Sequence, residues 1–211
     1  MREFLLYVSD DAGRYLGDFL APCREWDLAV NNFRGLPFDA RGAEYAFQTP
    51  GHKWHNIDAD IAEIAPRYRA CAFLDDDIEI SGHALNRLFH TGLAFDLDVW
   101  QPSLTDRSYV GWPHTRQVIG GVFRFVPFVE IMAPFFTRAA LARCWPTFRE
   151  NYSGWGIDFL WPLRFPNPRF AVIFTSATLV STAASSFASS AWIAARATLY
   201  SFSASTLSTS R

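Results

Sequence analysis

The chain has 211 residues, and half of them are hydrophobic, which is enough for one domain with a sizeable core. Its 19 basic and 21 acidic residues leave a formal net charge of −2. This balance argues against a protein that binds nucleic acid through a basic surface, and it gives no reason to expect an anionic membrane as a partner.

Signals for targeting and metal binding by cysteine are sparse. Residues 1–9 contain an apolar run too short for a secretory signal, and no run reaches the roughly 18 apolar residues of a membrane span. The three cysteines, Cys23, Cys71 and Cys144, are far apart and form no metal-binding pattern. Cys71 lies in an apolar run and is expected to be a buried thiol. We therefore expect a reducing, cytoplasmic location and no transmembrane segment.

Short apolar runs alternate with amphipathic stretches along the first half of the chain. The apolar runs predict strands at Glu3–Ser9, Trp26–Asn31, Glu44–Gln48, Tyr68–Leu74 and Asp98–Leu104. The amphipathic stretches predict helices at Arg14–Leu20, Lys53–Ile64 and His83–Leu93, the last capped by Ser81. Strands that alternate with helices favour an α/β fold with a mostly parallel central sheet flanked by helices.

The second half of the chain is less regular. A long loop is expected over Thr105–Gly121, and the apolar run Phe125–Phe136 is broken by two prolines. Further predicted features are a helix capped by Thr137 that runs to Phe148, an aromatic turn at Asn151–Asp158, a short helix at Phe159–Trp161 and a last strand at Arg169–Phe174. These elements complete a predicted domain over residues 1–174.

Residues 175–211 differ in composition from the rest of the chain. They consist almost wholly of Ser, Ala and Thr with scattered aromatic residues, and they contain no Gly, Pro or Asn for turns. The sequence therefore predicts a low-complexity tail. Two interpretations stay open: a disordered segment, or a segment read out of frame.

Three consecutive acids, Asp75, Asp76 and Asp77, directly follow the apolar run Ala70–Leu74. Adjacent like charges repel one another, so a triplet at a strand end needs a counter-charge. A divalent cation is the simplest one, because carboxylate oxygens suit Mg²⁺ and Mn²⁺. The alternative is a solvated acidic turn.

Other polar residues also fall where predicted strands end, namely Asp10, Asp11, Asn31 and Asn32. In sheets with mostly parallel strands, ligands bind beyond the carboxyl ends of the strands. This shared placement favours the metal site over the solvated turn.

Four blocks of sequence carry a resemblance to known proteins. Phe73–Asp77 resembles the DxD motif of GT-A nucleotide-sugar glycosyltransferases. Together with Trp100–Leu104, Val129–Arg138 and Gly154–Asp158, in this order and spacing, it resembles the domain-of-unknown-function family 707. The resemblance covers about Lys53 to Pro162 well and the first fifty residues loosely. It implies a GT-A-like fold and the transfer of a sugar from a nucleoside-diphosphate sugar to a carbohydrate or other hydroxyl acceptor.

The resemblance also implies roles for individual residues. Asp75 and Asp77 would hold Mn²⁺ or Mg²⁺, and Asp158 would be the general base, with Glu130 as a second candidate. Donor-binding candidates are Asp75, Asp76 and Lys53 and, from their positions at predicted strand ends rather than from the resemblance, Asp10 and Asn31. Acceptor-binding candidates are Trp155 and Gln101.

Each of these roles has a structural alternative. Asp158 is equally a residue type that caps helices, and Glu130 suits an ion pair with Arg124 or Arg138. Lys53 is also consistent with a solvated surface lysine. His114, in the long loop, is expected at the surface.

One departure from the GT-A pattern affects the whole site. Many GT-A enzymes supply a further metal ligand, commonly a His, after the last core strand, and here no His follows His114. The sequence is therefore also consistent with a catalytically impaired glycosyltransferase or a carbohydrate-binding domain. A second alternative is a metal-dependent phosphotransferase or hydrolase that uses the acid cluster.

Overall fold

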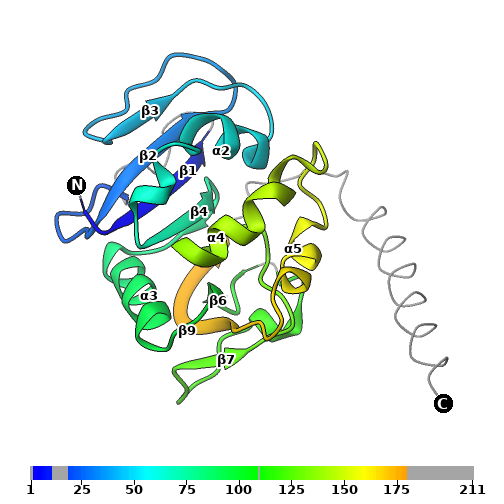
Figure 1. Cartoon of the computed structure of the whole chain (residues 1–211). Coiled ribbons are helices and arrows are strands. Elements are labelled where there is room, and N and C mark those ends of the chain that lie inside the picture. The colour runs from blue at the N-terminus through cyan, green and yellow to red at the C-terminus, as the bar shows by residue number, and fades with distance from the viewer. Residues whose placement is uncertain (1, 11–18, 109, 180–211) are drawn as a thin grey trace. The chain divides into compact units, whose positions relative to one another are not determined.

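The computed structural model describes residues 2–10, 19–108 and 110–179 (Figure 1). Its strands join in the order β3-β2-β1-β4-β8-β6-β9-β5, with β7 paired to β9. The strands are β1 (Phe4–Asp10), β2 (Trp26–Asn32), β3 (Tyr45–Phe47), β4 (Ala70–Asp75), β5 (Ile78–Glu79), β6 (Val99–Leu104), β7 (Phe123–Phe125), β8 (Phe135–Thr137) and β9 (Phe170–Leu179). The predicted α/β class is confirmed.

Helices and short 3₁₀ turns connect the strands. The described α-helices are α2 (Lys53–Ile61), α3 (Gly82–Ala94), α4 (Arg138–Cys144) and α5 (Ile157–Leu160). The 3₁₀ turns are η1 (Ala65–Arg67), η2 (Pro113–Thr115), η3 (Trp145–Arg149) and η4 (Pro162–Arg164). Ser81 and Thr137 cap α3 and α4 as predicted, because each hydroxyl accepts a hydrogen bond from the backbone N–H three residues later.

The sheet is parallel in two blocks and antiparallel between them. Strands β3, β2, β1 and β4 run parallel to one another, and so do β6 and β9. Strand β8 lies between β4 and β6 and is antiparallel to both. The mostly parallel sheet that the sequence predicts therefore holds within each block, and the Pro-interrupted run before Thr137 supplies the antiparallel strand that joins them.

Apolar residues on both faces of the sheet form two hydrophobic layers. In β1, Phe4, Leu6 and Val8 face the layer that includes Leu85 and Leu88 of α3. Residues Leu5 and Tyr7 face the other layer, which contains the apolar sides of α2 and α4. This alternation follows from the two-residue repeat of a strand, and it explains why β1 is buried along its whole length.

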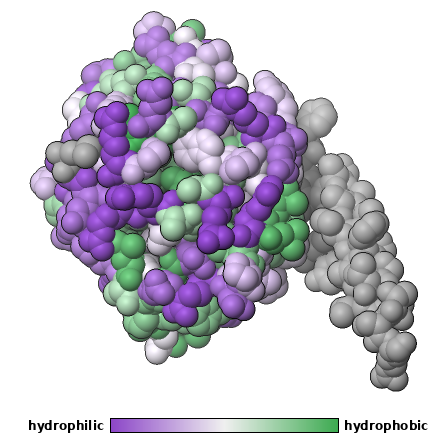
Figure 2. Space-filling view, viewed as in Figure 1, coloured by the Kyte–Doolittle hydropathy of each residue, from purple (hydrophilic) through white to green (hydrophobic). Residues whose placement is uncertain are grey.

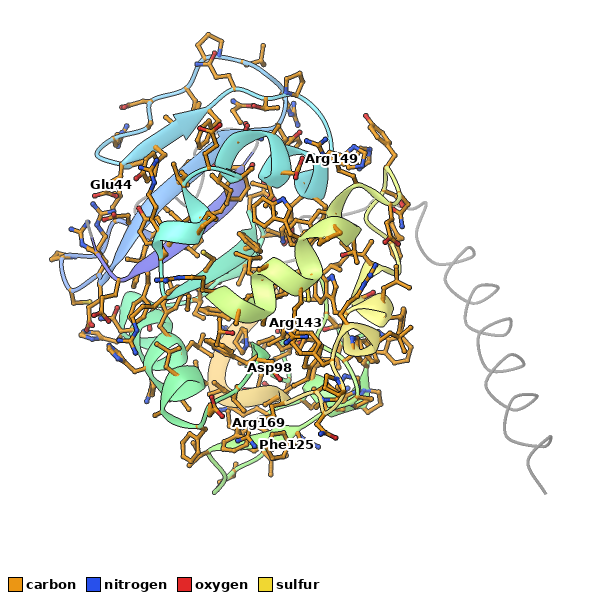
Figure 3. All side chains as sticks on the ribbon, viewed as in Figure 1. Glu44, Asp98, Phe125, Arg143, Arg149 and Arg169 are labelled. Carbon is orange, nitrogen blue, oxygen red and sulfur yellow. The ribbon has the colours of Figure 1, made fainter. Side chains whose placement is uncertain are left out.

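The far end of the sheet is fixed by Arg169, at the start of β9. Its backbone N–H donates to the Asp98 carboxylate at 2.9 Å, and its guanidinium lies 5.6 Å from the centre of the Phe125 ring. Figure 3 labels these three residues in the lower part of the molecule, with Asp98 above Arg169 and Phe125. The contacts join the starts of β6 and β9 to β7.

Some of the sequence predictions fall on residues that the structure does not describe, and one strand is longer than predicted. The predicted helix Arg14–Leu20 lies almost entirely outside them, as does Asp11. Strand β9 continues to Leu179, five residues beyond the predicted strand end and into the segment assigned to the tail. The rest of the predicted tail, residues 180–211, lies outside the described part of the chain.

The cysteines form no disulfide bonds in the structure. All three cysteines are free, and Cys71 is buried as predicted.

Within residues 2–10, 19–108 and 110–179, no helix has the length and apolar character needed to cross a bilayer. On the face drawn in Figure 2, hydrophilic and hydrophobic residues alternate over the surface.

Candidate functional site

The carboxyl ends of β1, β2 and β4 meet at one edge of the sheet. Because these strands are parallel and in register, Ser9 lies beside both Asn31 and Asp75. A cleft of about 520 Å³ opens at this edge. Its lining residues are Ser9, Phe33, Gly51, His52, Lys53, Asp75, Asp76, Asp77 and Tyr152. The three acids therefore line one cleft at the edge where ligands of such sheets bind.

The acid triplet begins on the last residue of β4 and continues into the tight turn before β5. All three acids are half-buried. One carboxylate oxygen of Asp77 is buried without a hydrogen-bond partner among the described residues. Burial, with the neighbouring charges of Asp75 and Asp76, raises the pKa of Asp77 to about 7. This environment differs from a fully solvated acidic turn.

Lys53, the first residue of α2, reaches into the site from the neighbouring helix. Its ammonium lies 2.9 Å from Asp75 Oδ1 and donates to the carbonyl oxygens of Phe73, Ile131 and Met132 at 2.9, 2.8 and 3.2 Å. The side chain is only 11% exposed, so the solvated-lysine alternative is wrong. Burial lowers the pKa of Lys53, and Asp75 partly offsets this effect. Protein groups already take up its three N–H donors.

The carboxylate oxygens of Asp75 and Asp77 fit one kind of metal site. Mg²⁺ is commonly held by one or two carboxylates together with substrate phosphates and water. The carboxylates of Asp75 and Asp77, with the unpartnered Asp77 oxygen, match that pattern. Among the described residues, no three His, Cys, Asp or Glu side chains come together as a metal cage. The site therefore suits a cation that a bound diphosphate helps to hold.

A second pair of acids, Glu130 and Asp158, lies outside the lining of the cleft, and the two carboxylates interact with each other. Both are buried. The backbone N–H of Glu130 donates to Gln101 Oε1 at 2.6 Å, and one Glu130 carboxylate oxygen is buried without a described partner. Burial, with the charge of Asp158, raises the pKa of Glu130 to about 7. Burial raises the pKa of Asp158 to about 6, although backbone N–H donors, including that of Ile131, limit the rise.

The structural alternatives for the second pair of acids are wrong. Gly156 is the N-cap of α5, with a φ of 85°, and Asp158 lies inside the first turn. The two arginines considered as partners of Glu130 donate elsewhere, Arg124 to the carbonyl of Arg116 and Arg138 to that of Tyr68. Gln101 is fully buried, so it supports Glu130 from within the core and presents no surface to an acceptor.

Segment 130–134 connects the two groups of acids. Met132 and Pro134 accept backbone hydrogen bonds from Asp75 and Phe73, both at 3.0 Å. The same segment carries Glu130 at its start, and the charge of Asp158 acts on the Glu130 carboxylate. Asp75 and Glu130 are thus attached to one short stretch of backbone.

The aromatic turn before α5 is shaped by its glycines. Gly154 has a φ of 73°, and a Cβ at this position would overlap the Trp54 indole, so only glycine fits without rearrangement. The turn presents Tyr152 and Trp155 to solvent, 63% and 58% exposed. Tyr152 lines the cleft and its ring centre lies 4.2 Å from that of His52. Trp155 lies outside the cleft lining, and its role as an acceptor contact stays a prediction.

The donor-binding roles predicted for Asn31 and Asp10 find no support in the cleft. The Asn31 side chain is fully buried and exchanges two hydrogen bonds with the backbone of Thr49, at 2.8 and 3.0 Å. Asp10 is also buried and does not line the cleft. Asn31 is in register with Ser9, but its amide is taken up by the Thr49 backbone, so of these neighbouring positions Ser9 and Asp75 line the cleft. Asp10 follows Ser9 in β1, and side chains alternate in direction along a strand.

Sequence reasoning missed the aromatic wall of the cleft. Phe33, His52 and Tyr152 come from three separate segments of the chain. Phe33 follows a predicted strand end, and Tyr152 belongs to the aromatic turn, so placement at strand ends and turns was the available signal. His114, expected at the surface, is half-buried with its ring against Phe128 at 4.8 Å between centres.

No protein-family model matches the sequence, and neither does any curated protein. Solved structures do match. Residues 1–349 of TarS from S. aureus give a TM-score of 0.53 at 15% identity, covering 84% of this chain and 60% of that one. A longer TarS structure gives 0.53 at 13% identity, with 84% and 37% covered. TarS 1–349 in complex with UDP gives 0.51 at 13% identity, with 82% and 58% covered.

These matches establish a likeness of fold. TarS is a GT-A-like glycosyltransferase, and the predicted GT-A-like architecture of this chain is confirmed at that level. The chain spans less than two thirds of each of the three TarS structures. The nearer resemblance to the domain-of-unknown-function family 707 stays a prediction.

Proposed function

We propose that this chain is a metal-dependent glycosyltransferase that moves a sugar from a nucleoside-diphosphate sugar to a hydroxyl acceptor. The observation that carries the proposal is the cleft at the carboxyl ends of β1, β2 and β4, with three acids on its floor. The UDP complex of TarS, a protein of similar fold, supports the choice of ligand class.

The acids of the cleft and the buried pair take different parts in the proposed reaction. Asp75 and Asp77 would hold Mn²⁺ or Mg²⁺ together with the donor diphosphate. When bound, that cation neutralises the charge that develops on the leaving diphosphate. The carbon–oxygen bond to the diphosphate breaks, and a bond forms from the acceptor oxygen to the same sugar carbon.

Asp158 would take the proton that leaves the acceptor hydroxyl. A carboxylate with a pKa of about 6 is mostly ionised at neutral pH, and it is a stronger base than an ordinary aspartate. Glu130, with a pKa of about 7, carries its proton over more of this pH range. The pair therefore favours Asp158 as the general base and Glu130 as its neighbour.

Binding and turnover test the proposal in two steps. Calorimetry with UDP, with and without Mn²⁺, should show metal-dependent binding to the wild type. Asp77→Asn should weaken this binding by about tenfold or more, since it removes a direct ligand, while the exposed Asp106→Asn serves as the control. Equal binding by Asp77→Asn and wild type contradicts the metal assignment.

A screen for hydrolysis and transfer across nucleotide sugars with Mn²⁺ then tests catalysis. Turnover of at least one donor by the wild type, and its loss in Asp77→Ala, is the expected result. Metal-dependent UDP binding without any donor turnover would point instead to a binding domain or an impaired enzyme. Release of inorganic phosphate without sugar transfer would point to a hydrolase.

A further inference from the structure

Asn31, near the carboxyl end of β2, holds the turn that leads into α2. Its side chain is fully buried and does not line the cleft, yet it bonds to the backbone two residues before Gly51, which does. We infer that Asn31 is a positioning residue that fixes the turn at residues 49–52 and, through it, one wall of the cleft. The inference rests on the proposed function and adds a residue that acts without touching the donor.

The turn and the first residue of α2 supply three consecutive residues of the cleft lining, namely Gly51, His52 and Lys53. The Lys53 ammonium lies 2.9 Å from Asp75 Oδ1. The His52 ring lies 4.2 Å, centre to centre, from that of Tyr152. A displacement of the turn would therefore move both the cation beside Asp75 and one side of the aromatic wall.

The Asn31 amide extends the pairing of β2 and β3 beyond the point where β3 ends. Asn31 is in register with Phe47, the last residue of β3. Two residues further on, the Thr49 N–H donates to Asn31 Oδ1 at 2.8 Å, and Asn31 Nδ2 donates to the Thr49 carbonyl at 3.0 Å. An amide presents an acceptor and a donor side by side, whereas a leucine of similar size presents neither. The side chain therefore fixes Thr49 much as a neighbouring strand would.

Two other side chains bond to Thr49, and both come from the helix that follows the turn. Asn56 Nδ2 donates to the Thr49 carbonyl at 2.9 Å, and the Thr49 hydroxyl donates to the Asp60 carboxylate. Asn56 and Asp60 belong to α2, so these bonds tie the turn to its own helix. Asn31 instead ties Thr49 directly to the sheet.

The attachments of this region to the sheet lie at different places along the chain. The Gly51 N–H donates to the Phe33 carbonyl at 3.0 Å, and the Tyr7 hydroxyl of β1 donates to Asp60 at 2.8 Å. The apolar side of α2 also packs in the core. Loss of the Asn31 amide should therefore release the start of the turn and leave α2 in place.

Lys53 is the only lysine of the chain, so its chemical labelling reports on the turn. Its side chain is 11% exposed, so acetylation by an N-hydroxysuccinimide ester, followed by mass spectrometry of the peptide, should be slow in the wild type. Asn31→Leu removes both bonds to Thr49 and should speed this labelling by about fivefold or more, because the released turn opens locally.

Asn86→Leu is the matched control for this labelling. The Asn86 amide also exchanges two hydrogen bonds with backbone, as acceptor from Glu25 and donor to Cys23, and it lies outside the cleft lining. Its loss should leave the labelling rate of Lys53 within about twofold of wild type. Protection of the Leu6 amide, in the centre of β1, shows by hydrogen exchange that each variant is folded.

Calorimetry with UDP and Mn²⁺ tests the consequence for the cleft. Asn31→Leu should raise the Kd for UDP by about tenfold, and Asn86→Leu should leave it within about twofold of wild type. If Asn31→Leu does not fold, Asn31→Ala, which removes the same two bonds, replaces it in both measurements.

Three results would overturn the inference. Labelling of Lys53 at the wild-type rate in a folded Asn31 variant shows that the turn does not depend on this amide. Faster labelling with unchanged UDP affinity shows that the cleft does not depend on the turn. Equal effects of Asn31→Leu and Asn86→Leu show a general loss of stability. A wild type that binds no UDP refutes the proposed function instead, and the labelling rates then decide whether Asn31 fixes the turn.

Discussion

Replacing Glu130 by Gln removes one ionisable group from a buried position and nearly preserves its shape. The backbone N–H of Glu130, which donates to Gln101, is kept. In the folded protein, burial and the charge of Asp158 raise the pKa of Glu130 from 4.5 to about 7. At about 1.4 kcal/mol per pKa unit, ionised Glu130 lowers the free energy of unfolding by about 3 kcal/mol.

The sign of the effect follows from proton binding. The folded state holds the Glu130 proton more tightly than the unfolded state does, so the stability of the wild type falls as the pH rises from about 4.5 to about 7. Above pH 7 the full penalty remains. Glu130→Gln lacks this penalty at every pH. Its stability relative to the wild type should therefore rise by about 2–3 kcal/mol between pH 5 and pH 8.

Urea denaturation at pH 5 and pH 8, followed by tryptophan fluorescence, measures this difference. The exposed Glu63→Gln is the control, and its stability relative to the wild type should change little between the two values of pH. If Glu130→Gln is destabilised equally at both, then Glu130 has no raised pKa, and the assignment of Asp158 over Glu130 as base loses its electrostatic support.

The remaining predictions concern the general base and the core. Asp158→Asn should lower the transfer rate by about a hundredfold or more and leave UDP affinity in the presence of Mn²⁺ within about twofold, as measured by initial rates and calorimetry. Retention of the wild-type rate would exclude Asp158 as the base. Gly92→Ala would bring a Cβ into the Trp100 indole and should cost about 1–3 kcal/mol of stability, seen as a lower thermal midpoint. A midpoint equal to that of the wild type would show that α3 moves away from the sheet without penalty.

Elements with a local signature could be predicted from the sequence. Strands β1 and β4 begin with continuous apolar runs, β2 is apolar from Trp26 to Val30 except at Asp27, and the helices α2 and α3 have apolar residues spaced by three and four. The caps of α3 and α4 are likewise local, because a hydroxyl bonds to an N–H three residues away. Strand β8 has three residues and pairs with strands more than thirty residues away in sequence, so no local pattern marks it.

In the candidate site too, features with a local sequence pattern could be predicted, and those that depend on contacts distant in sequence could not. The position of Asp75–Asp77 at a strand end was predictable, because an apolar run stops directly before it. The burial of Lys53 was not, because its carbonyl partner Ile131 lies 78 residues further along the chain. Asn31 shows the opposite error: a polar side chain at a strand end was assigned to a ligand, and it bonds to Thr49 instead.

Charge balance at the end of β4 gives the physical argument for a cation in the cleft. Three acids line the cleft there, and Lys53 supplies a positive charge that is engaged by Asp75 and backbone carbonyls. Asp77 keeps one buried carboxylate oxygen without a partner among the described residues, and burial, with the charges of Asp75 and Asp76, raises its pKa to about 7. Protonation of Asp77 relieves the repulsion in the free protein. In the proposed function a divalent cation would relieve it as well and leave the carboxylate ionised, and a diphosphate would complete the coordination that two aspartates leave open. On this reasoning metal and donor should bind to the cleft cooperatively, because each supplies the charge that the other requires.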